Sequence, residues 1–214
     1  MIFSYRSCAE VPLKISGVYH IHPISQHPVP VFCDMTTTGG DWTVIQKRMD
    51  GSVDFYRNWD DYKWGFGNKS GEYWLGLENI HAMTSQGTYR LRFDLEDFEG
   101  NTRYAEYNSF LVSSEADNYR VTIGSYSGTA GDSFNSAHNG RQFSTKDRDN
   151  DSNDAGHCAV LFTGAWWYNG CHNSNPNGQY LGGPNYHNGK GINWYTWLGL
   201  YYSLKKVEIK IRPV

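Results

Sequence analysis

Alternation of apolar and polar positions marks several segments of this chain as strands. The clearest examples are residues 89–96, 103–112 and 207–212. Successive side chains of a strand point to opposite faces of a sheet, so this period predicts strands with one face on the core and the other in solvent. We predict that these segments form a central antiparallel sheet, to which the last strand of the chain returns.

Shorter segments complete the predicted strands. Residues 119–123 extend the sheet, and residues 42–48 enter it from the N-terminal side. Residues 17–21 and 31–35 are short apolar runs on either side of a proline-containing loop, residues 23–30. Because proline and glycine interrupt regular structure, these runs predict two strands in a small N-terminal unit.

Two short helices are predicted between the strands at 42–48 and 89–96. Asn58 can cap a turn that carries Trp59, Tyr62 and Phe66 on one face. Residues 74–83 repeat apolar side chains at positions 74, 77, 80 and 83, which is the spacing of a helix with one buried face. Strands followed by helices and then more strands predict the α+β class.

Residues 135–203 have little periodic pattern and are rich in Gly, Asn and Pro. Irregular segments of this length are uncommon in compact domains unless they are functional. The pattern therefore divides the chain into three parts: a stapled N-terminal part (1–41), a central sheet (42–134 with 204–214) and a loop-rich part (135–203). A chain of 214 residues could form one large domain or two small ones.

Charge and length exclude several classes of function. The formal net charge is −3 and is spread along the chain, so no basic stripe is available for nucleic acid or for a membrane surface. No apolar run approaches the roughly 20 residues of a membrane-spanning helix, so we expect no membrane insertion. Residues 1–7 lack the apolar core of a signal peptide, so a secreted form is expected to be a mature or excised fragment.

The cysteines are even in number and fall into one early and one late pair: Cys8, Cys33, Cys158 and Cys171. Of the three possible connectivities we favour the one with two local bridges, Cys8 with Cys33 and Cys158 with Cys171. Disulfides persist in oxidising compartments, so this pairing predicts a secreted, extracellular protein.

An acidic run precedes Cys158. Within residues 146–154 there are four aspartates against only one lysine and one arginine: Asp147, Asp149, Asp151 and Asp154 with Lys146 and Arg148. Carboxylates this close repel one another unless a cation lies between them, and alternate spacing suits an oxygen-lined loop for calcium (Ca²⁺). Zinc is disfavoured because Cys158 and Cys171 are separated by twelve residues. The alternative is that the acidic run is a solvated loop.

Two sequons for N-linked glycosylation are present, Asn68-Lys-Ser70 and Asn150-Asp-Ser152. A glycan on Asn150 would crowd the predicted calcium loop. We therefore expect Asn68 to be the acceptor if either asparagine is used.

Several motifs occur in a fixed order along the chain, and together they resemble the fibrinogen C-terminal domain family over residues 8–213. The resemblance is nearest to ficolins, tachylectin-5-like lectins and chitin-binding receptors that recognise acetyl groups. The motifs are Cys33-Asp-Met, Gly40-Asp-Trp-Thr-Val-Ile-Gln-Lys-Arg-Met-Asp-Gly-Ser52, Asp54-Phe-Tyr-Arg-Asn-Trp59, Gly71-Glu-Tyr-Trp-Leu-Gly-Leu77, Phe143-Ser-Thr-Lys-Asp-Arg-Asp-Asn-Asp151, Gly164-Ala-Trp-Trp-Tyr168 and Lys210-Ile-Arg-Pro-Val214.

The resemblance implies that residues 1–214 form a single domain with a fibrinogen C-terminal-like fold, and that its third part, residues 135–203, holds calcium and ligand. The family pattern places the metal between the carboxylates of Asp149 and Asp151 and the backbone carbonyls of Asn153 and Ala155. The loop before Cys158 is one residue longer than in ficolins, so Gly156 is an alternative to Ala155. Calcium in this family is structural and does not contact the ligand.

The resemblance also implies a pocket for an acetyl group beside the second disulfide. The backbone amides of Cys171 and His172 would face the acetyl oxygen. Two positions depart from the usual pattern, Asn188 in place of an aromatic residue and Leu200 in place of a large ring. Our candidates for the wall around the methyl group are Phe162, Tyr168, Tyr186 and Tyr201.

We therefore expect a secreted lectin that binds acetylated groups, such as those of N-acetylated sugars, in innate-immune pattern recognition. We also expect clustering into an oligomer, because single sites of this kind gain strength by avidity. The alternative is a domain that recognises a receptor or peptide. An enzyme is not expected, because the chain has neither a Gly-rich phosphate loop nor a nucleophile elbow, and aspartates committed to calcium are poor proton donors.

Overall fold

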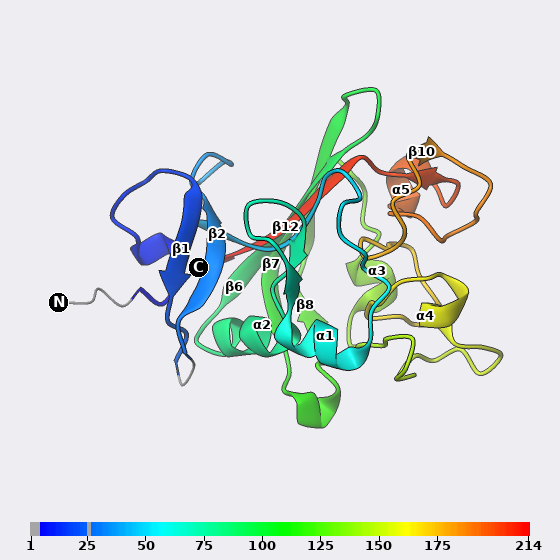
Figure 1. Ribbon diagram of the computed structural model, residues 1–214, viewed down its shortest axis with the longest axis horizontal. Coiled ribbons are helices and arrows are strands. Elements are labelled where there is room, and N and C mark those ends of the chain that lie inside the picture. Colours follow the sequence, from blue (N-terminus) through cyan, green and yellow to red (C-terminus); the bar gives the residue numbers. More distant parts are fainter. Residues whose placement is uncertain (1–4, 25–26) are drawn as a thin grey trace.

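The computed structural model describes residues 5–24 and 27–214. Residues 1–4 of the N-terminal segment and residues 25–26 of the proline-containing loop lie outside the described residues. Figure 1 shows a central sheet with short helices at one end and a loop-rich region, coloured yellow to orange, beside it. Cis peptide bonds are absent from the described part of the chain.

The central sheet is antiparallel, and the described residues contribute ten strands to it. Its main path runs in the order β1-β2-β3-β12-β6-β7-β8, with β5 on β3, β4 on β5 and β9 on β7. The strands are β1 (Gly17–Ile21), β2 (Val29–Asp34), β3 (Trp42–Arg48), β4 (Phe66–Gly67), β5 (Tyr73–Trp74), β6 (Tyr89–Glu96), β7 (Thr102–Val112), β8 (Val121–Ile123), β9 (Tyr126–Gly128) and β12 (Lys206–Pro213).

Every strand predicted from alternation is present, with bounds that differ by one or two residues at some ends. The last strand returns to the sheet as predicted, and it takes a central position between β3 and β6 (Figure 1). The N-terminal hairpin of β1 and β2 continues the same sheet, because β2 pairs with β3.

The helices are short: α1 (Trp59–Trp64), α2 (Leu77–Thr84), α3 (Asn135–His138), α4 (Cys158–Leu161) and α5 (Tyr195–Leu198), with 3₁₀ turns η1 (Cys8–Glu10) and η2 (Glu115–Asp117). A further small sheet pairs β10 (Gly183–Pro184) with β11 (Tyr202–Ser203). No helix in the described part of the chain has the length and apolar character needed to cross a membrane.

Two details of the helix prediction are wrong. Phe66 lies in β4 rather than on α1, and the helix predicted from residue 74 begins at Leu77, because Trp74 belongs to β5. Gly76 separates the two elements with a φ of +104°, and a Cβ there would lie 2.7 Å from the carbonyl carbon of Trp64. Apolar spacing could not distinguish this tight strand-to-helix turn from continuous helix.

Aromatic side chains join the inner face of the sheet to the loop-rich segment. Phe93 of β6 lies 4.9 Å from Trp194 and 5.2 Å from Phe134, measured between ring centroids. Trp166 and Trp167 lie between the two cysteines of the second disulfide and are at most 1% exposed. Burial of apolar surface stabilises the folded state by about 25 cal/mol per Å². Because these large rings are buried, they hold in place a segment that has little regular structure.

Buried polar contacts from β3 reinforce that attachment. Gln46 donates from Nε2 to the Pro176 carbonyl at 3.0 Å, and Arg48 donates from Nη1 to the same carbonyl at 3.0 Å and to the Gly178 carbonyl at 2.8 Å. Buried carbonyls of an irregular segment need such donors, because an unpaired polar group in the interior is costly.

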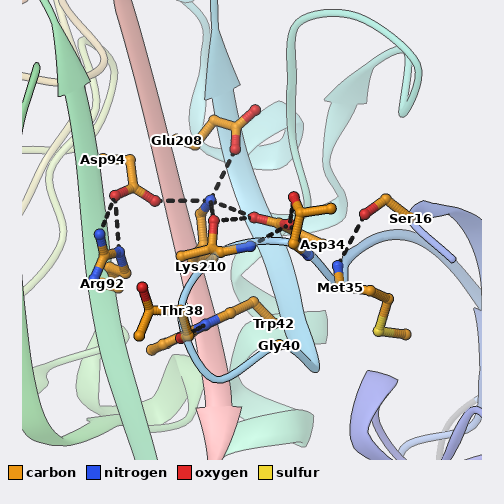
Figure 2. Close-up of polar contacts among 12 residues, drawn as sticks. Ser16, Asp34, Met35, Thr38, Gly40, Trp42, Arg92, Asp94, Glu208 and Lys210 are labelled. Atoms are coloured by element: carbon orange, nitrogen blue, oxygen red, sulfur yellow. Dashed lines mark hydrogen bonds and ion pairs between the residues drawn. The ribbon is translucent and has the colours of Figure 1, made fainter. Parts of the chain in front are cut away.

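The outer face of the sheet carries a buried ion-pair cluster around Lys210 of β12 (Figure 2). Its ammonium group contacts the carboxylates of Asp34, Asp94 and Glu208 at 2.7, 2.8 and 3.0 Å. This cluster joins β2, β6 and β12. A pocket of about 640 Å³ opens over it, and no residue of the 135–203 segment lines that pocket.

Candidate functional site

Both disulfides have the predicted pairing. Cys8 is bonded to Cys33 with a Cα–Cα distance of 5.5 Å, and Cys158 is bonded to Cys171 with a Cα–Cα distance of 5.3 Å. No free cysteine occurs among residues 5–24 and 27–214. The second bridge joins α4, which follows the acidic loop, to the loop before His172.

The aspartates of the acidic loop take two different roles. Asp147 turns toward the start of α1, where its carboxylate accepts the Trp59 N–H at 2.9 Å, and it also accepts the Thr145 hydroxyl at 2.7 Å. The Asp151 carboxylate accepts the N–H groups of Asn153 and Cys158, each at 2.8 Å. Asp149 is exposed and accepts the Asp151 N–H at 3.2 Å.

These contacts bring Asp149 and Asp151 together in one tight turn that ends at Cys158. Burial raises the pKa of Asp151, as does the neighbouring Asp149 carboxylate. Paired carboxylates without a basic partner are the electrostatic situation that a bound cation relieves.

The donor chemistry fits a hard cation. The Asn153 carbonyl accepts the Gly156 N–H at 3.2 Å and retains a second lone pair. Carboxylate and carbonyl oxygens of this kind are the ligands that calcium prefers. No group of three His, Cys, Asp or Glu side chains that could hold a metal occurs in the described part of the chain. A site here would thus need backbone carbonyls, as the sequence hypothesis with Asn153 and Ala155 assumes.

The acidic turn is tied directly to the loop that precedes His172. The Ser152 N–H donates to the Asn169 carbonyl at 3.2 Å, and the Asn169 N–H donates to the Cys171 carbonyl at 2.9 Å. Together with the disulfide, these bonds make the geometry of residues 169–172 depend on the acidic turn.

The backbone N–H groups of Cys171 and His172 are adjacent donors. In the stretch of chain that the structure describes, neither donates to a protein acceptor. Unpaired N–H groups are uncommon in native structures and need a partner from water or a ligand. Two neighbouring donors can serve a single carbonyl oxygen.

His172 is held in one tautomer. Its Nε2 lies 2.9 Å from the Gly189 carbonyl, which can only accept, so Nε2 carries the proton and Nδ1 has the lone pair. Nδ1 is buried without a hydrogen-bond partner in the described structure. Burial lowers the pKa of His172 to about 4, so the ring is neutral at physiological pH.

Two of the predicted wall residues lie against His172. The Phe162 ring meets it edge-on with centroids 4.7 Å apart, and the Tyr168 ring lies 5.9 Å away. Phe162 is half-buried, whereas Tyr168 is fully buried and donates its hydroxyl to Asn175 Oδ1 at 2.7 Å. Tyr168 therefore contacts His172 from the protein interior and is not part of an exposed wall.

The structure does not bring the other two wall candidates into this cluster. The side chain of Tyr186 is 99% exposed and that of Tyr201 is 58% exposed. Their segments are joined by the Asn185 N–H, which donates to the Tyr201 carbonyl at 2.9 Å. Both tyrosines lie on the surface of the loop-rich segment, where side-chain rotation alone can change what they contact.

Sequence reasoning missed two buried residues that position the site. The fully buried His138 donates from Nδ1 to the Trp167 carbonyl at 2.8 Å, and its Nε2 faces the N–H groups of Asn173 and Ser174 at 3.4 and 3.3 Å. Burial lowers the pKa of His138 to about 3. A single histidine in an irregular segment carries no pattern that indicates this role.

Asn175 is the second missed residue. Its Nδ2 faces the carbonyls of Phe162, Gly189 and Gly191 at 3.2, 3.2 and 3.3 Å, so one side chain joins three parts of the loop-rich segment. It precedes Pro176 in an Asn-Pro step, which from sequence alone indicates only a turn.

Taken together, the antiparallel sheet, the two disulfides and the loop-rich segment define a disulfide-stapled fold. Residues 4–214 match the family model described as the fibrinogen beta and gamma chains, C-terminal globular domain, and the chain belongs to this family. Domains of this family are non-catalytic binding modules. The suspected resemblance is thereby confirmed, as is the predicted fold.

Two relatives indicate the cellular location of this chain. Human microfibril-associated glycoprotein 4 is 54% identical over 224 residues, covering 97% of this chain and 87% of the relative. Human fibrinogen C domain-containing protein 1 is 52% identical over 205 residues, covering 92% of this chain but only 44% of the relative. The relatives are extracellular proteins, and this chain is likewise an extracellular domain.

Solved structures of two relatives have the same fold. The fibrinogen-like globe domain of human ANGPTL2 superposes with a TM-score of 0.94 at 46% identity, covering 98% of this chain and 99% of that chain. A lamprey fibrin D-dimer, complexed with the peptide ligand Gly-His-Arg-Pro-amide, superposes with a TM-score of 0.93 at 39% identity, covering 100% of this chain and 74% of that chain.

Proposed function

We propose that this domain is an extracellular lectin that binds acetylated groups, with N-acetylated sugars as the first ligand class. The observation that carries the proposal is the pair of adjacent N–H donors at Cys171 and His172, which no protein acceptor uses within residues 5–24 and 27–214. An acetyl group offers one carbonyl oxygen and one methyl group. It therefore needs convergent donors beside an apolar surface.

The surroundings of these donors supply the apolar surface and the rigidity. The Phe162 and His172 rings lie edge to face, and the disulfide between Cys158 and Cys171 fixes the backbone that carries the donors. Donors that are already aligned require little ordering on binding, so more of the interaction energy appears as affinity. The sequence prediction placed Tyr186 and Tyr201 in the wall around the methyl group. Because both side chains are exposed, we propose them instead for contacts with the part of the ligand that projects into solvent.

Calcium is part of this proposal as a structural ion. Asp149 and Asp151 would hold it with the carbonyls of Asn153 and Ala155, or of Gly156 in place of Ala155. Calcium, when bound, supplies the positive charge that offsets repulsion between the two carboxylates. Members of this family often bind calcium, which supports the assignment. Because Ser152 is bonded to Asn169, order in the acidic turn is transmitted to the ligand-binding loop.

The second candidate function is recognition of a peptide or receptor. The lamprey fibrin relative was solved with a four-residue peptide, which favours this alternative for a domain of the same fold. The exposed Tyr186 and Tyr201 would suit a protein partner as well as a sugar. In either case we propose that the whole protein clusters several domains, because avidity raises the strength of weak single sites.

Titration calorimetry with N-acetylglucosamine, glucosamine and glucose tests the first proposal. Burial of so few ligand atoms gives an expected Kd of roughly tens of micromolar to millimolar for N-acetylglucosamine, and no measurable binding of the other two sugars. His172→Ala should weaken binding at least several-fold. His187→Ala is the matched control, because this exposed histidine lies in the neighbouring loop and uses only backbone groups in its hydrogen bonds.

Equal binding of acetylated and plain sugars would contradict the proposal, as would equal effects of the two histidine substitutions. Titration with Gly-His-Arg-Pro-amide tests the second candidate in the same instrument. Binding of the peptide with no response to N-acetylglucosamine would favour peptide recognition.

A further inference from the structure

We propose that Asn68 carries an N-linked glycan and that Asn150, in the second sequon, does not. Both asparagines satisfy the same sequence rule, and an extracellular chain meets the glycosylation machinery during secretion. The surroundings of the two amide nitrogens differ, and this difference carries the inference. It is independent of the ligand proposed above.

The Asn150 side chain is turned into the protein. Its Nδ2 donates to the Phe143 carbonyl at 2.8 Å, and its backbone N–H donates to the Ser144 hydroxyl at 2.9 Å. Phe143 and Ser144 are fully buried. A sugar on Nδ2 would lie within hydrogen-bond distance of that buried backbone, where there is no room for a branched polar group. The native contacts of Asn150 are therefore incompatible with a glycan.

Asn68 lies in the turn between β4 and β5 and is exposed. Its Oδ1 accepts the Ser70 N–H at 2.9 Å, its backbone N–H donates to the Glu72 carbonyl at 2.9 Å, and its carbonyl accepts the Gly71 N–H at 2.9 Å. The turn thus uses every hydrogen-bonding group of Asn68 except Nδ2. Within residues 5–24 and 27–214, no protein acceptor bonds to this nitrogen.

The other two residues of the sequon have a favourable arrangement. Ser70 is exposed on the same turn as Asn68. Lys69 between them is half-buried and places its ammonium group 4.4 Å from the centre of the Tyr73 ring, so its long side chain lies against the protein. The surface next to Asn68 is thereby left open for a sugar.

The modification itself needs only a standard donor, an oligosaccharide linked through diphosphate to a lipid. The Nδ2 atom of Asn68 forms a bond to the anomeric carbon of the first sugar and loses one proton. The bond between that carbon and the diphosphate oxygen breaks, and the lipid diphosphate leaves with the electron pair. No oxidation or reduction takes place.

The hairpin that would carry the glycan is fixed by its own hydrogen bonds and by Glu72. The hydrogen bonds of Asn68 and Ser70 stay within the β4–β5 hairpin. Glu72 at the end of this turn accepts the N–H groups of Met49, Asp50 and Gly51, which join the hairpin to the loop after β3. A glycan here would extend from the short β4–β5 hairpin, whose strand β4 pairs only with β5 among the described strands.

The test is secretion of residues 1–214 from mammalian cells behind an added signal peptide, followed by peptide-N-glycosidase digestion in heavy-oxygen water and peptide mapping. Conversion of a glycosylated asparagine to labelled aspartate identifies the site. We expect label at Asn68 and none at Asn150. Asn68→Gln and Ser70→Ala should each remove the glycan and its mass shift on a gel.

Ser70→Thr is the matched control, because threonine preserves the sequon and should retain full occupancy. Ser70→Ala and Ser70→Thr change the same exposed side chain, but only Ser70→Ala removes the sequon. Comparing the two variants therefore separates loss of the glycan from loss of folding. Secreted wild-type protein without label at Asn68 would overturn the proposal. Label at Asn150 would overturn the structural argument that distinguishes the two sites.

Discussion

Replacement of Lys210 by methionine is the most direct test of how the sheet is held together. The Lys210 side chain is 2% exposed, and its ammonium group lies within 3.0 Å of carboxylate oxygens of Asp34, Asp94 and Glu208 (Figure 2). Asp94 is also paired with Arg92 at 2.7 Å, and Glu208 with Lys47 at 2.8 Å.

Asp34 is therefore the carboxylate that depends most on Lys210. Its side chain is 8% exposed and has no other basic partner in the described structure. Burial alone would raise the pKa of Asp34, but the hydrogen bond and the charge of Lys210 outweigh it, and the pKa lies well below its usual range. Asp34 still accepts hydrogen bonds from Thr36 and Thr37, so it would stay ionised and unpaired after the substitution.

The expected cost follows from this arrangement. Removing one partner of a buried ion pair destabilises by ~3–5 kcal/mol because the remaining charge is uncompensated. Methionine refills most of the volume of the lysine stem, and Asp94 and Glu208 keep partners and are 30% and 25% exposed. We therefore expect about 3 kcal/mol, or a fall in Tm of about 6–12 °C for a chain of this length.

Urea unfolding followed by tryptophan fluorescence measures the change. Lys206→Met on the same strand is the matched control, because Lys206 bonds Glu96 at 2.8 Å but is 44% exposed, and such pairs contribute less than about 1 kcal/mol. Adding Asp34→Asn to the Lys210→Met variant should restore part of the loss. Equal and small costs for the two lysine substitutions would refute the reasoning.

Three further predictions concern the loop-rich segment. Chelation of calcium should lower the Tm of the wild type at matched ionic strength, and Asp151→Asn should abolish that difference; identical melting with and without calcium would contradict the metal assignment. Gly189→Ala should weaken N-acetylglucosamine binding several-fold in calorimetry, because its φ is +73° and a Cβ would lie 2.7 Å from the Phe162 ring; unchanged affinity would remove Phe162 from the site. The pKa of His138 is lowered to about 3 from 6.5, so the stability linked to this neutral ring is present above pH 6.5 and is lost as pH falls toward 3. Urea unfolding of His138→Gln between pH 4 and 7 should show a shallower pH dependence than the wild type, and parallel curves would count against it.

The sequence alone predicted the sheet well because alternation is a local signal. In an extended conformation, residues 89–96 and 207–212 place their apolar side chains on one face, whichever strands lie beside them. These residues form β6 and β12. The cysteine pairing was also accessible, because each bridge closes a short loop. The acidic turn was recognisable from charge density within a few residues, although its metal stays a prediction.

Tertiary structure decided the features that depend on residues far apart in the chain. Asp34 and Lys210 are separated by 176 positions, and nothing in either local sequence indicates that they meet in a buried ion pair. The same holds for His138, which contacts the loop before Ser174 from 36 positions away. Such contacts arise from packing of the sheet and its loops, not from local propensity.

The proposed ligand site shows most clearly which features the sequence predicts and which the tertiary structure decides. Sequence and family resemblance indicated Phe162, Tyr168 and His172, and the fold brings these three rings together. They also indicated Tyr186, which the fold leaves almost wholly exposed. The residue type determines which chemical groups a position can offer. The burial and direction of each side chain depend instead on the aromatic core, the disulfide and the buried hydrogen bonds that position the irregular loops. Residues 135–203 have no regular period, so no local pattern could predict which of their side chains are buried or where they point.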